Sequence, residues 1–213
     1  MLPWDHNAYY HRLVLRAVPD GAEQVLEVGC GTGQLAAELA AGCGHVTAVD
    51  RDAGMIAAAR AAVPDNVTCT LADIAEMSLE PGSYDAVVSV SMLHHLALPV
   101  VLPRLAEALR PGGVLVAVAV PKRDLPRELL VELAASLWHH GLGIFLVLSR
   151  FRHREHLRHS PLHAAMPIRD PVSTTRDVRR EAGRLLPGST VRRLLLWRYL
   201  LVWRKPGPGA GAR

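Results

Sequence analysis

The sequence predicts an α/β protein with a doubly wound, mostly parallel sheet and helices on both faces. Five short apolar runs alternate with helical segments at regular spacing, which is typical of parallel strands joined by crossover helices. The first run is nearly all apolar, as expected for a strand that is buried on both faces. At 213 residues, 50% of them hydrophobic and 21% charged, the chain is long enough for one such domain.

The first strand is predicted at residues 25–28 and ends in a turn with three glycines, Gly29-Cys30-Gly31-Thr32-Gly33. A helix is predicted to follow over residues 34–41 and to end at Gly42. Glycine lets the backbone approach a ligand closely and adopt positive φ, and a helix start offers unpaired N–H groups. This strand–turn–helix context predicts a site for a nucleotide-like ligand.

Two acids accompany the turn. Glu27 lies two residues before the first glycine, and Asp50 ends the second predicted strand, 45–49, 17 residues after Gly33. A carboxylate at this position can accept hydrogen bonds from both hydroxyls of a ribose. A dinucleotide-binding motif would need a glycine at Gln34, so the spacing disfavours that class.

The pattern E-x-G-x-G-x-G followed by V-D resembles the class I S-adenosylmethionine-dependent methyltransferases, in particular the small-molecule type of the UbiE group. The strings D-x-V-V-S-x-S-x-L-H-H-L and L-R-P-G-G-V-L-V strengthen the resemblance, which is firm over residues 25–120. It implies a seven-stranded Rossmann-like sheet with the last strand antiparallel and a helical lid after the fifth strand. It also implies the cofactor S-adenosyl-L-methionine and the product S-adenosyl-L-homocysteine.

The remaining elements are predicted from apolar runs, caps and turns. Asp52 and either Ser173 or Thr174 are suitable N-cap residues. The predicted helices are 7–18, 53–62, 100–109, which Arg110-Pro111-Gly112-Gly113 ends, and 174–186. The predicted strands are 67–71, 84–90, 114–120, 191–197 and 199–205. Between the last two strands only one or two residues remain for a turn, without glycine or asparagine, so either the turn is strained or a boundary lies elsewhere.

These elements predict a single methyltransferase domain over residues 1–205. Its parts are an N-terminal cap helix (1–20), a cofactor-binding core (21–120), a lid or substrate insertion (121–170), a closing helix and strand pair (171–205), and then a disordered tail (206–213).

The resemblance also implies a set of cofactor-binding residues. In it, Asp73 binds the adenine amino group and either Met55 or Ile74 packs on the ring; a carboxylate that only caps a turn is the alternative for Asp73. The full set is Glu27, Gly29, Cys30, Gly31, Gly33, Asp50, Arg51, Met55, Asp73, Ile74, Ser89 and His95.

Candidates for a catalytic base follow the fourth strand. His94 and His95 are expected close to the transferred methyl group, and imidazole titrates near neutrality. The alternative is that one of them hydrogen-bonds the sheet end and the other lines the cofactor pocket. Tyr10 and His11 in the N-terminal helix are second-rank candidates.

Several motifs of other methyltransferase classes are absent, and this restricts the class of acceptor. The N/D-P-P-Y/F string of nucleic-acid amino methyltransferases is replaced by Ser89-Val90-Ser91-Met92, which disfavours DNA. Cytosine C5 chemistry needs a nucleophilic cysteine, and the cysteine near the site, Cys30, lies inside the turn. The three cysteines have no metal-ligand spacing. We expect no metal, a small-molecule acceptor, and a monomer or homodimer.

The charge distribution is uneven. Residues 1–120 hold six arginines against thirteen acids, and residues 121–213 hold 18 basic residues against seven acids. Mutual neutralisation in one fold explains this, and the alternatives are an RNA or protein methyltransferase that docks through the basic half, or a non-catalytic cofactor-binding module. The second alternative includes a contact with membrane surfaces through Trp138 and residues 144–148. The N-terminus has no apolar signal region, and we expect a cytoplasmic protein without a transmembrane segment.

Overall fold

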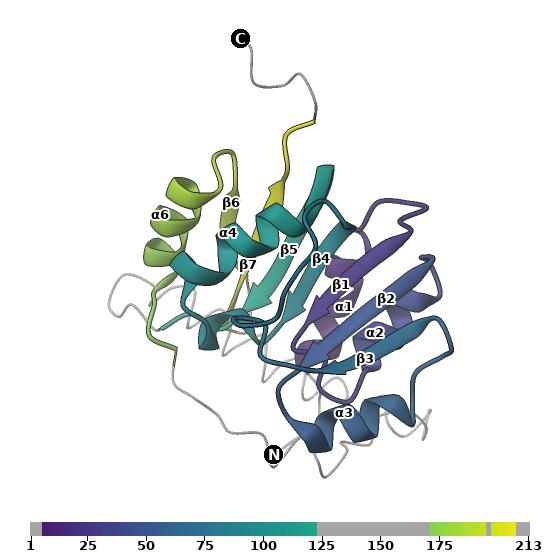
Figure 1. Ribbon diagram of the computed structural model, residues 1–213. Coiled ribbons are helices and arrows are strands. Elements are labelled where there is room, and N and C mark those ends of the chain that lie inside the picture. Colours follow the sequence, from purple (N-terminus) through teal and green to yellow (C-terminus); the bar gives the residue numbers. More distant parts are fainter. Residues whose placement is uncertain (1–5, 123–170, 195–196, 208–213) are drawn as a thin grey trace, which may run out of the picture.

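A computed structural model describes residues 6–122, 171–194 and 197–207, and there one mixed sheet organises the chain (Figure 1). Its strand order is β3-β2-β1-β4-β5-β7-β6, and only β7 runs antiparallel to its neighbours. The predicted seven-stranded Rossmann-like sheet is confirmed. The strands are β1 (Gln24–Val28), β2 (His45–Asp50), β3 (Val67–Leu71), β4 (Tyr84–Val90), β5 (Leu109–Ala119), β6 (Thr190–Leu194) and β7 (Arg198–Arg204).

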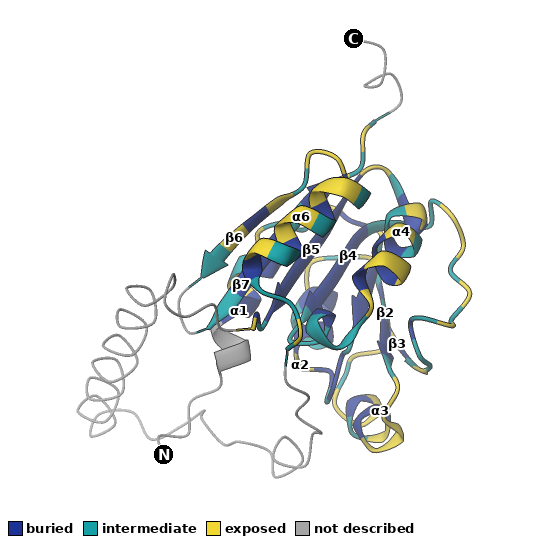
Figure 2. Cartoon of the chain, turned by 90° about the vertical axis from the view of Figure 1, so that its left-hand side faces the viewer, coloured by how far each residue is buried: buried dark blue, intermediate teal, exposed yellow. Residues whose placement is uncertain are grey.

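Helices cover both faces of the sheet, which confirms the doubly wound arrangement (Figures 1 and 2). The first three helices pack on one face, and η1, α4 and α6 pack on the other. The helices are α1 (His6–Leu15), α2 (Gln34–Ala40), α3 (Ala53–Arg60), the 3₁₀ turn η1 (Leu93–His95), α4 (Leu98–Ala108) and α6 (Thr175–Leu185).

The sheet has a hydrophobic core on each face, and alternate residues of each strand point into one core or the other. In β1, Val25 packs with α1 and α2, whereas Leu26 and Val28 pack toward α4. Since successive side chains of a strand point to opposite faces, a strand with apolar residues at both odd and even positions is buried on both sides. The one polar exception at the centre of β1 is Glu27, which is buried on the face of α1 and α2.

Two predicted helix caps are confirmed. Asp52 accepts a hydrogen bond from the Met55 amide at the start of α3. Thr174, rather than Ser173, caps α6 in a capping box with Asp177, in which each side chain accepts the other residue's backbone N–H.

The boundary between α4 and β5 differs from the prediction. The helix ends at Ala108, and β5 starts at Leu109, so the stretch 110–113 that was expected to stop the helix lies inside the strand. The ladder with β4 is irregular here, because Tyr84 pairs with Leu109 and Ala86 already pairs with Val114. The proline and glycines therefore form a bulge in a strand, not the end of a helix.

The boundary of β6 lies elsewhere than predicted, which was one of the two alternatives, because the strand ends at Leu194 and not at residue 197. The longer turn still contains one strained residue. Leu194 pairs with Arg198, which leaves three residues for the turn. Trp197 adopts φ 56°, a left-handed conformation that costs a residue with a side chain on the order of 1–2 kcal/mol.

The ends of the predicted lid lie side by side. The Lys122 amide donates a hydrogen bond to the Ser173 carbonyl at 2.8 Å, and Lys122 forms a parallel bridge with Thr174. Residues 123–170 of the predicted lid lie outside the described residues, as does most of the tail. This part of the lid includes Trp138, residues 144–148, and residues 150–160, which are rich in arginine and histidine. Among the described helices, none is long and apolar enough to cross a membrane.

Candidate active site

The glycine turn lies at the carboxyl end of β1 and is fastened to β2. The amides of Gly29 and Cys30 both donate to the Val49 carbonyl, at 2.8 and 3.1 Å. Gly29, Gly31 and Gly33 have φ values of 78°, 53° and 81°, where a side chain is disfavoured. The predicted need for glycine in this turn is therefore confirmed in its backbone.

Neighbouring side chains add a second reason for two of the glycines. A Cβ at position 29 would lie 2.6 Å from the Cβ and Cγ of Met92, and one at position 33 would lie 2.7 Å from the Cγ1 of Val63. Met92 follows β4, so the turn after β1 packs directly on the segment after β4. Sequence reasoning did not identify Met92, because no local pattern links it to Gly29.

Asp50 reaches from the end of β2 to the turn. Its Oδ2 accepts a hydrogen bond from the Gly31 amide at 2.9 Å, and its Oδ1 accepts one from the Asp52 amide at 3.0 Å. A carboxylate offers about four acceptor sites, so two remain for hydroxyl groups of a ligand. Arg51, also predicted to bind cofactor, is exposed beside it.

Glu27 is buried behind the turn with 2% of its surface exposed. Burial, and then the charges of Asp50 and Glu38, raise its pKa to about 8. Its Oε2 has no hydrogen-bond partner among the described residues. A buried carboxyl group without a hydrogen-bond partner, next to a glycine-rich turn, is a feature typical of a binding site.

The second-rank catalytic candidates lie on the same face as Glu27. His11 of α1 places its Nδ1 3.0 Å from Oε1 of Glu38 in α2, and Tyr10 is buried in the core between α1 and the sheet. The imidazole of His11 thus joins two helices. Glu38 was not predicted, although its position one helical turn after Gln34 placed it near the turn.

The predicted adenine-binding residues follow β2 and β3. Oδ1 of Asp73 accepts a hydrogen bond from the Ala75 amide at 2.9 Å, so the alternative role as a turn acid is present. Ile74 is buried in the core with Leu26, and Met55 is buried in α3. Their contact with a cofactor stays a prediction.

The segment after β4 carries the predicted base. Ser89 donates its hydroxyl to the Val28 carbonyl at 3.0 Å, which ties the ends of β4 and β1 together. Ser91 then adopts φ 58°, an unusual conformation for a residue with a side chain, and leads into η1. The rings of His94 and His95 lie 4.0 Å apart between centroids.

His94 is uncharged at neutral pH. Burial, and then the charges of His95 and Arg198, lower its pKa to about 4. Its Nδ1 is buried without a hydrogen-bond partner in the described part of the chain. A neutral imidazole of this kind can accept a proton or a hydrogen bond.

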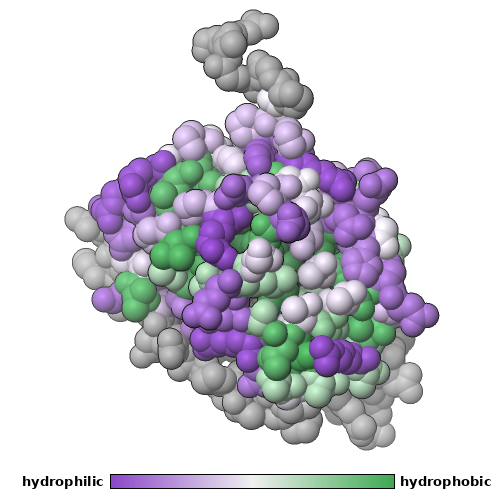
Figure 3. Space-filling model, viewed as in Figure 1, coloured by the Kyte–Doolittle hydropathy of each residue, from purple (hydrophilic) through white to green (hydrophobic). Residues whose placement is uncertain are grey.

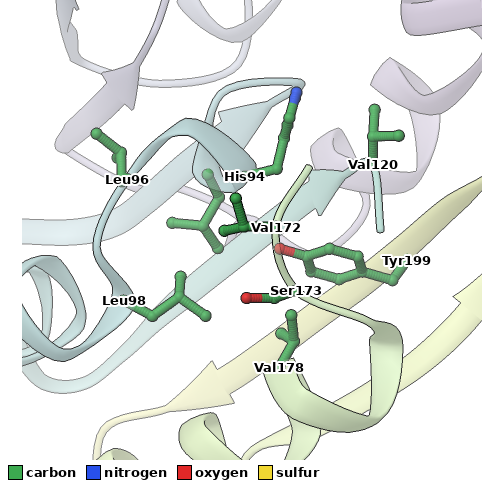
Figure 4. A pocket seen from close by; sticks show the side chains of 9 residues that line it. His94, Leu96, Leu98, Val120, Val172, Ser173, Val178 and Tyr199 are labelled. Carbon is green, nitrogen blue, oxygen red and sulfur yellow. The ribbon is translucent and has the colours of Figure 1, made fainter. Parts of the chain in front are cut away.

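Next to His94 the structure forms a small hollow that is partly open to solvent and has room for about one water molecule (Figure 4). Aliphatic side chains of η1, α4, the end of β5 and the start of α6 line it, together with the hydroxyls of Ser173 and Tyr199. Sequence reasoning identified neither hydroxyl, because the two residues come from distant segments. The hollow and the glycine turn lie at the carboxyl ends of neighbouring strands, where open α/β sheets bind ligands.

Comparison with known proteins gives the class. Residues 25–113 match the family model described as "Methyltransferase domain". The chain is 36% identical over 207 residues to an uncharacterized methyltransferase of Mycobacterium bovis, which covers 96% of this chain and 98% of the relative. The chain belongs to the class I S-adenosylmethionine-dependent methyltransferases.

Two further similarities are informative. Over 154 residues the chain is 36% identical to the trans-aconitate 2-methyltransferase of Deinococcus radiodurans, which covers 70% of this chain and 54% of that enzyme. A solved structure, the complex of DhpI with S-adenosylhomocysteine, superimposes with a TM-score of 0.64 at 21% identity and covers 98% of this chain and 88% of that one. At this identity the superposition shows the shared fold. The cofactor of the class is S-adenosylmethionine, as the resemblance implied.

Proposed function

We propose that this enzyme transfers the methyl group of S-adenosylmethionine to an oxygen, nitrogen or carbon atom of a small molecule. The observation that carries the proposal is the lining of the small hollow after β4 and β5, which is mostly aliphatic and includes no lysine or arginine among the described residues. A nucleic-acid backbone is held mainly by basic side chains, so this lining favours a small molecule. A similar protein from Deinococcus radiodurans is named for methylation of a small acid, trans-aconitate, which supports a small-molecule acceptor.

The residues present fit the cofactor. Asp50 retains acceptor capacity for the ribose hydroxyls, and Gly29 and Thr32 of the glycine turn are partly exposed. The unpartnered Oε2 of the buried Glu27 is suited to a cationic ligand, because a positive charge nearby stabilises the carboxylate. We assign Asp73, Met55 and Ile74 to the adenine; Cys30, Arg51, Ser89 and His95 complete the proposed set.

The bound cofactor supplies an activated methyl group on a sulfonium. The chain must then hold the acceptor atom in line with it and exclude water. Where the acceptor carries a proton, His94 is a weak base because its pKa is only about 4, so its neutral imidazole is better suited to accept a hydrogen bond from the acceptor than to remove the proton completely. Tyr10 and His11 are poorly suited, since Tyr10 is buried in the core and His11 contacts Glu38.

Docking of a polyanion has weaker support. On α6, Arg180 contacts Asp177 at 2.9 Å and Arg184 contacts Glu181 at 2.7 Å, so local acids offset part of the positive charge. The face seen in Figure 3 has hydrophilic residues scattered among hydrophobic ones. A nucleic-acid surface gathers its basic residues into a patch or stripe.

Isothermal titration calorimetry with S-adenosylmethionine and S-adenosylhomocysteine tests the proposal. We expect Asp50→Ala to weaken binding by about 1.5–3 kcal/mol, because charge-assisted hydrogen bonds are lost. Asp20→Ala, at an exposed carboxylate before β1, is the matched control and should bind normally. Absence of binding to the wild type, or equal affinity in the Asp50 and Asp20 variants, would reject the cofactor site.

A further inference from the structure

The buried carboxyl group of Glu27 gives the cofactor site a property beyond the capacity to hold a ligand. We propose that binding of the cofactor is coupled to the loss of one proton from Glu27, so that the site exchanges this proton for a positive charge of the ligand. The proposal rests on the proposed function, because it needs a cationic cofactor at the glycine turn. Membership in the family does not assign this change of protonation.

Glu27 is enclosed by the sheet and by the helices on one of its faces. It pairs with Ala48 of β2 and Val88 of β4, and its side chain points to the same face as that of Val25, toward α1 and α2. Only 2% of its surface is exposed, and its Oε2 has no hydrogen-bond partner among the described residues. An ionised carboxylate here would lose its hydration without a compensating hydrogen bond to Oε2, so the neutral acid is favoured.

The charges that act on Glu27 are negative. Burial, followed by the charges of Asp50 and Glu38, raises its pKa to about 8. The imidazole of His11 contacts Glu38, with its Nδ1 3.0 Å from Oε1. No arginine or lysine of the described ranges is among the causes of this pKa shift. The titratable and charged groups on the elements around Glu27 are Tyr10 and His11 of α1, Cys30 of the turn, Glu38 of α2, Asp50 of β2, Cys69 of β3, and Arg60 of α3, which donates to the Cys69 carbonyl.

The turn that is proposed to hold the cofactor lies next to these acids. Oδ2 of Asp50 accepts the Gly31 amide at 2.9 Å. Burial, and then the charges of Glu27 and Asp50, raise the pKa of the Cys30 thiol inside the turn. A cation held at the turn is therefore within electrostatic reach of both carboxyl groups. It lowers the pKa of Glu27, because an opposite charge nearby stabilises the carboxylate.

The exchange balances in atoms and charge. Before binding, the Glu27 carboxyl is neutral and carries one proton. On binding, its O–H bond breaks, the electron pair stays on the oxygen, and the proton passes to solvent, while a positive charge of the cofactor becomes the counter-ion. That charge is either the sulfonium, which S-adenosylmethionine alone carries, or the ammonium of the amino-acid part, which S-adenosylhomocysteine also carries. 5′-Methylthioadenosine carries neither and serves as the uncharged probe.

Isothermal titration calorimetry in buffers of different ionisation enthalpy measures the number of protons released per ligand bound. The titrations are run at about pH 6 to 7, below the ordinary pKa of an α-amino group at about 7.7–8.0, so that the ammonium of the ligand keeps its charge. Because Glu27 is protonated in the free protein at this pH, we expect S-adenosylmethionine to release about one proton and to bind about tenfold more tightly at pH 7 than at pH 6. Both effects should disappear in Glu27→Gln, since an amide does not titrate, and 5′-methylthioadenosine should release no proton.

Glu80→Gln, the same change at an exposed acid between β3 and β4, is the matched control and should release the proton as the wild type does. The proton count of the wild type decides the proposal even if the Glu27 variant does not fold. Release with both cofactor forms supports the ammonium as counter-ion, and release with S-adenosylmethionine alone supports the sulfonium. Binding without proton release, the same release in Glu27→Gln, or equal release with 5′-methylthioadenosine would overturn the proposal and leave the proposed function intact. Absence of binding by both cofactor forms would reject both.

Discussion

The glycine turn and the hollow lie on the same edge of one sheet, but different chemical groups line them. The turn offers backbone and carboxylates, with Asp50 on one side and the buried Glu27 behind it. The hollow offers aliphatic side chains and two hydroxyls. The turn and the hollow therefore differ in polarity, and Met92, which packs against Gly29, directly precedes Leu93 and His94 of the hollow along the chain.

We expect the largest effect on cofactor binding and stability at Gly29, which packs against Met92. Gly29→Ala should abolish measurable S-adenosylhomocysteine binding and lower the free energy of unfolding by about 3 kcal/mol, since it combines a positive φ with a clash against Met92. Gly82→Ala is the control, because φ there is 63° and nothing lies within 4 Å of the added Cβ. Calorimetry and denaturant unfolding measure both. If Met92→Gly, which removes both clashing atoms Cβ and Cγ, fails to relieve the Gly29→Ala defect, the contact is not its cause.

On the cofactor side, Glu27 should make stability fall as pH rises. Its folded pKa is about 8 against an ordinary 4.5, so the folded state holds a proton that the unfolded state releases. This stability is complete below the ordinary pKa and is lost as pH rises through about 8, by at most about 1.4 kcal/mol per pH unit. Denaturant unfolding of apoprotein at several pH values should show this slope in the wild type and not in Glu27→Gln. Equal slopes would contradict it.

On the acceptor side, Thr174→Ala should lower the free energy of unfolding by about 1 kcal/mol, because it removes the cap of α6. Affinity for S-adenosylhomocysteine should stay unchanged, since the cap lies beside the hollow and not beside the turn. Ser78→Ala, at an exposed serine between β3 and β4, is the matched control. A parallel loss of cofactor affinity would show that the two sides are energetically coupled.

His94 should give a pH dependence of stability with the opposite sign to that of Glu27. Its folded pKa is about 4 against an ordinary 6.5, so the unfolded state takes up a proton first as pH falls. Stability should drop between about pH 6.5 and 4, by less than about 1 kcal/mol per pH unit because the ring is partly exposed. The difference in unfolding free energy between wild type and His94→Gln isolates this slope. A difference that does not change with pH would refute the assignment.

The two sides also differ in how far sequence predicts them. The turn, Asp50 and the cap at Asp52 were predicted because each depends on residues close in sequence. The hollow was not, since Ser173 and Tyr199 meet His94 only after β5, α6 and β7 have packed. The raised pKa of Glu27 likewise depends on tertiary burial, which periodicity does not reveal.

Boundary errors have the same origin. Arg110-Pro111-Gly112-Gly113 reads locally as a helix stop, and only pairing with β4 makes it part of a strand. The shift of the β6 boundary to Leu194 was one of two predicted alternatives, because the spacing of two apolar runs is itself a local signal.

The bond from the Lys122 amide to the Ser173 carbonyl has a practical consequence for protein engineering. Two points far apart in sequence lie within one hydrogen bond of each other, so a linker of a few residues spans them. Residues 123–172 can therefore be replaced by such a linker without stretching the chain between Lys122 and Ser173. Grafting the corresponding segment of a related methyltransferase between these points would test the prediction that this segment sets the choice of acceptor.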